Sequence, residues 1–185
     1  QSQHLSYLID DLKTLSLLDS EELSFQIQNI DPGLIIKQVE GAYKPLAADK
    51  GVKIQAEVQS DLPRVNLDPD RLTQCLLNLY INAIQAMEDG GTLTVESAVA
   101  GSKNVAITVS DSGRGIAPDH LNKIFDPYFT TKKKGTGLGL AIVHKIIEAH
   151  QGHIEVESTL GQGTSFIVKI PCQPPNQQGG NDGIT

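Results

Sequence analysis

Helical and β-strand patterns alternate along this chain, and this alternation constrains the fold more than any other feature. Apolar residues recur about every 3.6 residues over 31–49, 68–88 and 138–150, which predicts three amphipathic helices. Short apolar or alternating runs bounded by turn residues predict strands over 24–30, 52–58, 64–67, 92–99, 104–110, 153–158 and 164–170. Strands separated by helices and followed by a final hairpin indicate a mixed sheet with helices on one face.

Residues that favour helix ends mark the first two of these helices. Asp31 and Pro32 begin the first one, with proline in the first turn, and Asp68 caps the second. The sequence Asp-Gly-Gly at 89–91 ends the second helix. On the inward face of the first helix we place Leu34, Ile35, Val39, Ala42 and Leu46.

The two ends of the chain differ from its middle. Leucines with 3-4-3 spacing over residues 1–19 fit two structures, a coiled-coil helix or an amphipathic helix that folds back on its own domain. The Pro, Gln, Asn and Gly content predicts a disordered tail over 172–185. Because the chain begins inside a helical pattern and without Met, we expect it to be part of a longer protein.

The composition indicates a globular domain with an aliphatic core. Hydrophobic residues make up 39% of the 185, charged residues make up 20%, and tryptophan is absent. A net charge of −7 argues against nucleic acid as a partner, because phosphate backbones require a basic face. Cys75 and Cys172 lie far apart, which argues against a zinc site or a disulfide scaffold and fits a reducing compartment. The sequence contains no run of about eighteen apolar residues that predicts a membrane span.

The predicted helix 68–88 has an unusual polar face. Leu72, Leu76, Leu79, Ala83 and Ala86 form an apolar stripe, and the opposite side carries Arg71, Gln74, Asn78, Asn82 and Gln85. A polar stripe is often only a solvated face, but asparagine is a poor helix former, and two of them stand here at i and i+4. Neutral amide oxygens suit a magnesium ion whose charge is already balanced by phosphates.

A second candidate group follows the predicted strand 104–110. Strand alternation places Asp111 on the same face as Val105, Ile107 and Val109, which is the face expected to be buried. Gly113 and Gly115 follow directly and allow a ligand to approach the backbone. A buried carboxylate suits a base edge that carries an exocyclic amine, such as adenine, although an Asx turn that closes the strand has the same sequence pattern.

A third candidate group is the glycine-rich sequence before the helix 138–150. Gly135, Gly137 and Gly139 precede or begin this helix, whose first amides and positive dipole end favour phosphate oxygens. Their GxGxG spacing fits neither a Walker A loop nor a Rossmann fingerprint. The irregular stretch 111–137 contains one short predicted helix near 119–124 and is long enough to indicate a functional lid.

These motifs in this order resemble the catalytic and ATP-binding domain of bacterial sensor histidine kinases, in the superfamily that also contains gyrase, the chaperone ATPases and MutL. Four segments are similar to family motifs, namely 78–83 to the N box, 111–115 to the first G box, 125–129 to the F box and 135–140 to the second G box. The segments 83–87 and 128–132 are most similar to nitrogen-regulator and metal-responsive kinases.

The resemblance covers about residues 24–171 and implies a Bergerat-type two-layer α/β sandwich, with a mixed, mostly antiparallel sheet preceded by a coiled-coil-like helix. It divides the chain into the end of a dimerisation helix with its linker (1–22), the ATP-binding catalytic domain (23–171) and the tail (172–185).

The resemblance also implies a Mg-ATP site. Asn82 would coordinate Mg²⁺ between the phosphates with help from Asn78, and Asp111 would accept a hydrogen bond from the adenine amine. Gly113 and Gly115 would shape the purine pocket. Further nucleotide contacts are expected from the lid (125–134) and the second glycine loop, namely Ile116, Phe125, Thr131, Lys132, Gly135, Thr136, Gly137, Leu138 and Gly139. Lys132 is the candidate cation for the terminal phosphate, and it forms the predicted catalytic set with Asn78 and Asn82; the other reading of Lys132 is a solvated loop lysine.

The sequence departs from the family pattern at two places. Some members carry Lys and Tyr directly after the N box, where this chain has Gln85 and Ala86, so those two roles are not transferred and more phosphate neutralisation must come from the lid. The phosphoacceptor motif of the family is also absent around His4, so we expect the acceptor histidine to lie on a dimerisation domain outside this sequence.

The implied function is therefore transfer of the ATP γ-phosphate to that histidine, for relay to a response regulator receiver domain. The implied partners are the protein's own dimerisation domain, that receiver domain and a second copy in a homodimer. The resemblance implies a cytoplasmic domain and leaves open whether the parent is anchored in the bacterial inner membrane.

Three other functions stay open at this point. A conformational ATPase of the same superfamily would need a glutamate general base, but this chain has Asn78 there, which cannot accept a proton from water. A regulatory module could bind nucleotide without kinase activity. A serine-kinase regulator of sigma factors would use the same fold, but the predicted N-terminal helix fits a dimeric histidine kinase better.

Overall fold

The main sheet has five strands in the computed structural model, which describes residues 12–16, 24–132 and 135–172. Their order is β2-β4-β5-β7-β6, and only β2 and β4 pair in parallel. The strands are β2 (Val52–Val58), β4 (Gly91–Ala100), β5 (Asn104–Asp111), β6 (His153–Thr159) and β7 (Gly163–Pro171). A separate antiparallel pair is formed by β1 (Gln28–Ile30) and β3 (Val65–Leu67).

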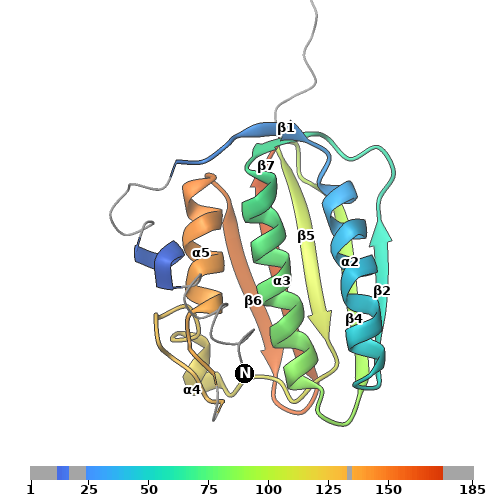
Figure 1. The fold of residues 1–185 in the computed structure, drawn as a ribbon, viewed down its shortest axis with the longest axis vertical. Helices are drawn as coiled ribbons and strands as arrows, with labels where there is room; N and C mark the ends of the chain where they lie inside the picture. The colour runs from blue at the N-terminus through green and yellow to red at the C-terminus, as the bar shows by residue number, and fades with distance from the viewer. Residues whose placement is uncertain (1–11, 17–23, 133–134, 173–185) are drawn as a thin grey trace, which may run out of the picture.

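Three long helices cover one face of this sheet, with α3 between the other two (Figure 1). They are α2 (Pro32–Ala48), α3 (Pro69–Ala86) and α5 (Gly139–Ala149), and the short α4 (Pro118–Leu121) lies between β5 and α5 in the chain. The expected two-layer α/β fold with a mixed, mostly antiparallel sheet is confirmed.

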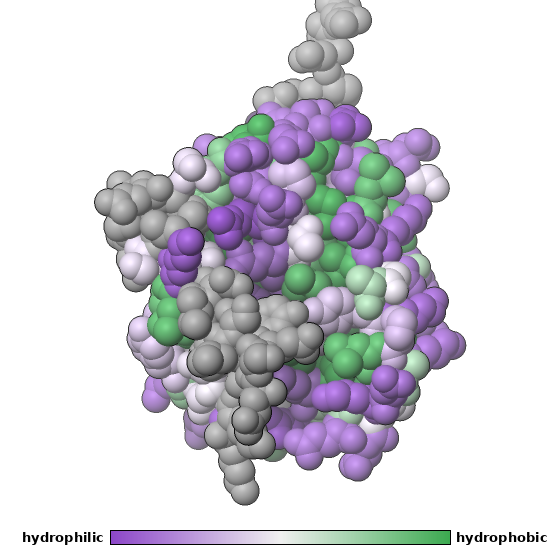
Figure 2. Space-filling view, viewed as in Figure 1, coloured by the Kyte–Doolittle hydropathy of each residue, from purple (hydrophilic) through white to green (hydrophobic). Residues whose placement is uncertain are grey.

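Aliphatic side chains fill the space between the two layers, as the composition predicts. The inner face of the sheet presents buried residues from β4, β5 and β7, and α3 buries Leu76, Leu79 and Tyr80 against them. The outer surface of the helical layer is mostly hydrophilic (Figure 2). Within the described ranges, no helix combines the length and the apolar character needed to cross a bilayer.

Two details of the sequence prediction are wrong. The first strand is shorter than 24–30, and it pairs with β3 rather than joining the main sheet. On α2 three predicted inward residues, Leu34, Ala42 and Leu46, are exposed, Leu34 to 64% and Leu46 to 48%. Ile36 and Ala47 are buried instead. Apolar residues occur on both sides of α2, so the periodicity alone did not determine which side packs on the sheet.

The helical pattern at the N-terminus is described only over residues 12–16. In this turn Leu15 is 5% exposed and packs in the core of the domain, whereas Leu12 is 46% exposed. At this turn the helix therefore packs on its own domain, as in the fold-back alternative. The remaining residues of the predicted dimerisation helix and linker, 1–11 and 17–22, lie outside the described residues. The same holds for residue 23, the first of the predicted catalytic domain, and for residues 173–185 of the predicted tail. Cys172, the first residue of that tail, pairs with Val65.

Asp68 connects the segment before β1 to the start of α3 and the end of α5. Its Oδ1 accepts hydrogen bonds from the Asp70 and Arg71 amides, and its Oδ2 accepts from the Gln26 amide at 2.9 Å. Its own amide donates to Nε2 of His150 at the end of α5. The carboxylate is therefore both the cap of α3 and an anchor for the segment 24–27.

We predict that Asp68→Ala lowers the free energy of unfolding by about 2 kcal/mol, because it removes a helix cap and leaves the Gln26 amide without its acceptor. Asp31→Ala is the matched control, since Asp31 caps α2 through the Gly33 amide alone, and it should cost about 1 kcal/mol. Urea unfolding of the two variants measures the difference. Equal losses would show that the anchor contributes nothing beyond the cap.

Candidate functional site

A cavity of about 490 Å³ lies between the C-terminal half of α3, the turn after β5, the segment before α5 and the tip of the β6–β7 hairpin. This volume lies in the range of small-molecule and cofactor sites. Most of the residues predicted from the sequence line it, although they come from three separate parts of the chain. The predicted residues that line it are Asn78, Asn82, Asp111, Gly115, Ile116, Thr131, Lys132, Gly135, Thr136, Gly137 and Gly139.

Three predicted residues do not line the cavity. Gly113 lies behind Asp111, where a β-carbon would approach the Ala86 carbonyl oxygen to 2.6 Å, so this position requires glycine. The ring of Phe125 packs against His144 and Phe166, and Leu138 is 1% exposed in the core. These residues support the cavity wall from behind.

Asp111 ends β5 with its side chain toward the cavity, as strand alternation predicts. Its Oδ1 accepts a hydrogen bond from the Gly113 amide at 2.8 Å. Burial raises the pKa of Asp111 above its ordinary value, although backbone hydrogen bonds from Gly113 and Thr164 and the charge of Lys132 act in the opposite direction. A half-buried carboxylate of this kind can accept a hydrogen bond from a ligand's amine.

The second glycine loop contacts the polar face of α3. The Asn78 side-chain amide donates to the Gly139 carbonyl at 3.3 Å, which connects α3 to the first turn of α5. Gly137 has φ +71°, and a β-carbon there would collide with the Tyr128 backbone. The Leu138 amide donates to Thr136 Oγ1 at 3.2 Å. Among the described residues no side chain caps α5, so the amides of its first turn remain available to an anion.

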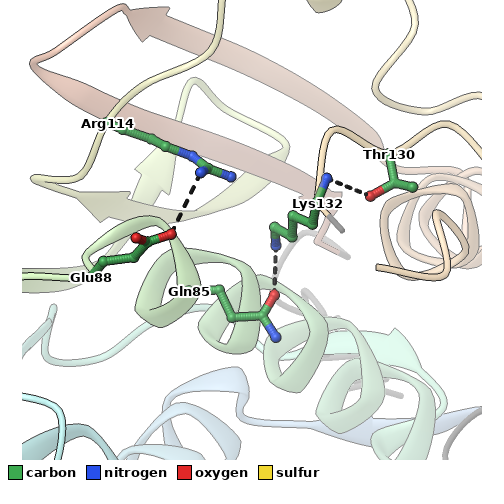
Figure 3. Close-up of polar contacts among 5 residues, drawn as sticks. All are labelled: Gln85, Glu88, Arg114, Thr130 and Lys132. Atoms are coloured by element: carbon green, nitrogen blue, oxygen red, sulfur yellow. Dashed lines mark hydrogen bonds and ion pairs between the residues drawn. The ribbon is translucent and has the colours of Figure 1, made fainter. Parts of the chain in front are cut away.

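Lys132 crosses from the lid segment to α3 (Figure 3). Its Nζ donates to Asn82 Oδ1 at 2.6 Å and to Gln85 Oε1 at 2.7 Å. Burial and the nearby charge of Arg114 lower the pKa of Lys132 to about 8, with Asp111 opposing the shift. The lid lysine is therefore not a solvated loop residue, because its ammonium group lies against the helix.

The surroundings of Asn82 fit the implied magnesium ion. The ammonium group of Lys132 already lies against the amide oxygen of Asn82, so this oxygen accepts a cation. Among the described residues, no group of three or more His, Cys, Asp or Glu side chains could hold a metal. A metal at Asn82 would therefore take most of its ligands from bound phosphate and water, which is the usual arrangement for Mg²⁺.

Several residues of the cavity were given no role by the sequence analysis. Gln85 was placed on the polar face of the helix with Asn78 and Asn82, but no family role was transferred to it, and it lines the cavity. Arg114 also lines the cavity, and its guanidinium group lies 3.7 Å from Glu88 (Figure 3). Leu160 and Thr164 come from the last hairpin, where no motif in the sequence connects them to Asp111.

A sequence profile described as histidine kinase-, DNA gyrase B- and HSP90-like ATPase matches residues 67–174. The chain belongs to this family. The matched region contains all four motifs and most of the cavity, so the resemblance inferred from the motifs is confirmed. The chain is an ATP-binding domain of this family.

Named relatives are sensor histidine kinases. The chain is 44% identical over 171 residues to sensor histidine kinase ZraS of Salmonella typhi, a match that covers 92% of the chain and 36% of the relative. The expected similarity to sensor histidine kinases is confirmed by this relative. The chain spans only about a third of the length of such relatives.

Solved structures of histidine kinases have the same fold. Full-length ShkA in complex with AMPPNP has a TM-score of 0.83 and 31% identity, covering 92% of this chain and 36% of that one. The nucleotide-free catalytic domain of ThkA has a TM-score of 0.72 and 34% identity, covering 80% of this chain and 97% of that one.

We predict that Asp111→Asn weakens ATP binding about 10- to 100-fold, because the side chain then presents an amide donor where a charged acceptor stood. The variant should stay folded, since asparagine keeps an oxygen for the Gly113 amide. Calorimetric titration with Mg-ATP measures the affinity. Binding as tight as that of the wild type would exclude Asp111 from the nucleotide contact.

The raised pKa of Asp111 also predicts that ATP binding weakens on acidification. A protonated carboxyl would be an uncharged and weaker acceptor for the adenine amine, and with a raised pKa this weakening begins at higher pH than for an ordinary aspartate. The affinity for ATP should fall from neutral to acidic pH in the wild type. Asp111→Asn corrects for protonation of ATP itself, so parallel pH profiles of the two proteins would contradict the prediction.

Proposed function

We propose that this domain binds Mg-ATP and transfers the γ-phosphate to a histidine on a dimerisation domain of its parent protein, for relay to an aspartate of a response regulator. One observation carries this proposal. A single cavity is lined by a half-buried carboxylate, Asp111, and by the cation-binding Asn82 with Lys132. This combination of groups suits a nucleotide with its adenine amine on Asp111 and its phosphates on α3 and α5.

The roles of the other residues follow from that orientation. Asn82 would hold Mg²⁺ with Asn78 beside it, and Mg²⁺ would draw the phosphate oxygens together and offset their charge. The free amides of α5 and the glycine loop would bind the phosphates, and Lys132 would place a positive charge on the terminal phosphate. Gly115 and Ile116 would line the purine pocket, and Thr131 and Thr136 would contact the nucleotide from the lid side.

The transfer itself requires positioning and charge stabilisation more than proton chemistry. A histidine nitrogen forms a bond to the γ-phosphorus while the bond to the ADP oxygen breaks, and the imidazole releases its proton. We infer no general base within this domain, because Asn78 and Asn82 cannot accept a proton. Direct hydrolysis of ATP by the domain should therefore be slow, unlike that of a conformational ATPase.

Similarity to sensor histidine kinases supports the remaining proposals. The partners would be the protein's own dimerisation domain, a second copy in a homodimer and a receiver domain. We also propose a cytoplasmic position for this domain and the division of the chain at residues 22 and 171.

We predict that the 185-residue chain incubated with γ-labelled ATP acquires no phosphohistidine by itself. Addition of a separately made dimerisation domain of the parent, carrying its histidine, should yield an acid-labile, base-stable label on that domain. The same domain with histidine changed to glutamine is the control.

Other outcomes distinguish the alternatives. Label on a partner's serine would indicate a sigma-factor regulator, and rapid phosphate release without transfer would indicate a conformational ATPase. ATP binding without transfer or hydrolysis would indicate a regulatory module. Label on His4 in the chain alone would overturn the assignment of the acceptor to another domain.

A further inference from the structure

Gln85 is one of two side chains on α3 that hold the ammonium group of Lys132. Asn82 and Gln85 stand at i and i+3 on α3, so their amide oxygens lie side by side on one face. Both oxygens accept from Lys132 Nζ, at 2.6 and 2.7 Å. Two short hydrogen bonds from one ammonium group define its position far better than one bond does.

Both acceptors are neutral. A carboxylate in the place of either amide would form an ion pair and cancel the charge of Lys132 toward any ligand. A carboxamide orients the ammonium group through its oxygen and leaves the full positive charge in the cavity. The pair of side chains therefore holds a cation without neutralising it.

Hydrogen bonds hold both the amide and the carbonyl of Lys132. The Lys132 amide donates to Thr130 Oγ1 at 3.1 Å (Figure 3). The Lys132 carbonyl accepts from the Gly135 amide at 3.1 Å. A side chain at Gly135 would collide with Thr130, so this position requires glycine. Gln85 thus meets a lysine whose backbone is already positioned.

The two acceptors differ in what a bound metal would do to them. Under the proposed function, Asn82 Oδ1 is a ligand of Mg²⁺, and a metal ion and an ammonium ion cannot share one oxygen because like charges repel. Lys132 would then keep its contact with Gln85 alone. This contact would leave its charge beside the metal, at the phosphate end of the cavity.

We propose that Gln85 is a positioning residue that holds Lys132 on the terminal phosphate of ATP while the metal occupies Asn82. This inference rests on the proposed function, because it requires that the phosphates lie against α3. Gln85 contributes to phosphate binding only through Lys132, so its effect should vanish when Lys132 is absent.

The experiment is a double-mutant cycle in the 185-residue chain. Titrations with Mg-ATP and with Mg-ADP compare wild type, Gln85→Leu, Lys132→Met and the double variant. Each single variant should weaken ATP binding about tenfold and ADP binding much less, because only ATP carries the terminal phosphate. The double variant should lose no more than Lys132→Met alone.

Gln85→Glu distinguishes the positioning of Lys132 from the charge that Lys132 presents to ATP. The carboxylate should bind Lys132 more tightly, so the amides of 130–132 should exchange hydrogen more slowly than in the wild type. ATP binding should nevertheless fall about tenfold or more, because the charge of Lys132 is cancelled. A purely structural role for Gln85 predicts the opposite, namely ATP affinity retained together with the slower exchange.

Gln74→Leu is the matched control. Gln74 accepts from Arg71 at 2.9 Å on the same helix, so it is also a glutamine that holds a cation, but it does not line the cavity. Its loss should leave affinity for ATP unchanged.

The inference is overturned if Gln85→Leu binds ATP within twofold of the wild type, or if the losses of the two single variants add in the double variant. Failure of the wild-type chain to bind ATP at all would instead reject the proposed function. The same set of titrations therefore tells the two failures apart.

Discussion

Burial of α3 between the sheet, α2 and α5 is the constraint on which the rest of the structure depends. One side of the helix packs Leu76, Leu79 and Tyr80 into the core, while Asn78 and Asn82 face the cavity. Since the apolar side is fixed by packing, the polar side has no freedom to turn away from the glycine loop. Core packing of the apolar side of α3 therefore determines where the candidate metal ligands on its polar side lie.

The same packing brings together the parts of the site that lie far apart in the chain. Asp111 ends the strand next to α3, and α5 begins beside Asn78 through the contact of Asn78 with Gly139. Lys132, which belongs to the lid segment, joins these residues through its two hydrogen bonds to α3. Each part contributes one kind of chemistry, namely an acceptor for a base, free amides for an anion, or a cation.

The site also shows how a fold stabilises charges that cost energy to bury. Burial raises the pKa of Asp111 and lowers that of Lys132, because it makes the charged form of each group less favourable than in water. Their mutual attraction and the surrounding amides offset part of this cost. The pKa values of such buried groups shift strongly when a charged ligand binds beside them. Shifted pKa values of this kind are common at functional sites.

Much of the fold could be predicted because each helix and strand depends on residues near one another in sequence. Asp31 and Asp68 cap the helices that they were expected to cap, and strand alternation alone placed Asp111 toward the buried side. The side of α2 that packs inward could not be predicted, because Leu34, Ile35 and Ile36 are adjacent and equally apolar. That choice depends on the sheet beneath the helix.

The sequence by itself determined most of the elements, the family and the candidate site residues, because motif residues and caps act over a few neighbouring positions. Only the tertiary structure decided which of them meet. Leu160 and Thr164 join the cavity through the pairing of β7 with β5, and no local pattern encodes that contact. The contact between Lys132 and Gln85 likewise joins residues 47 positions apart, and it exists because the lid segment folds onto α3.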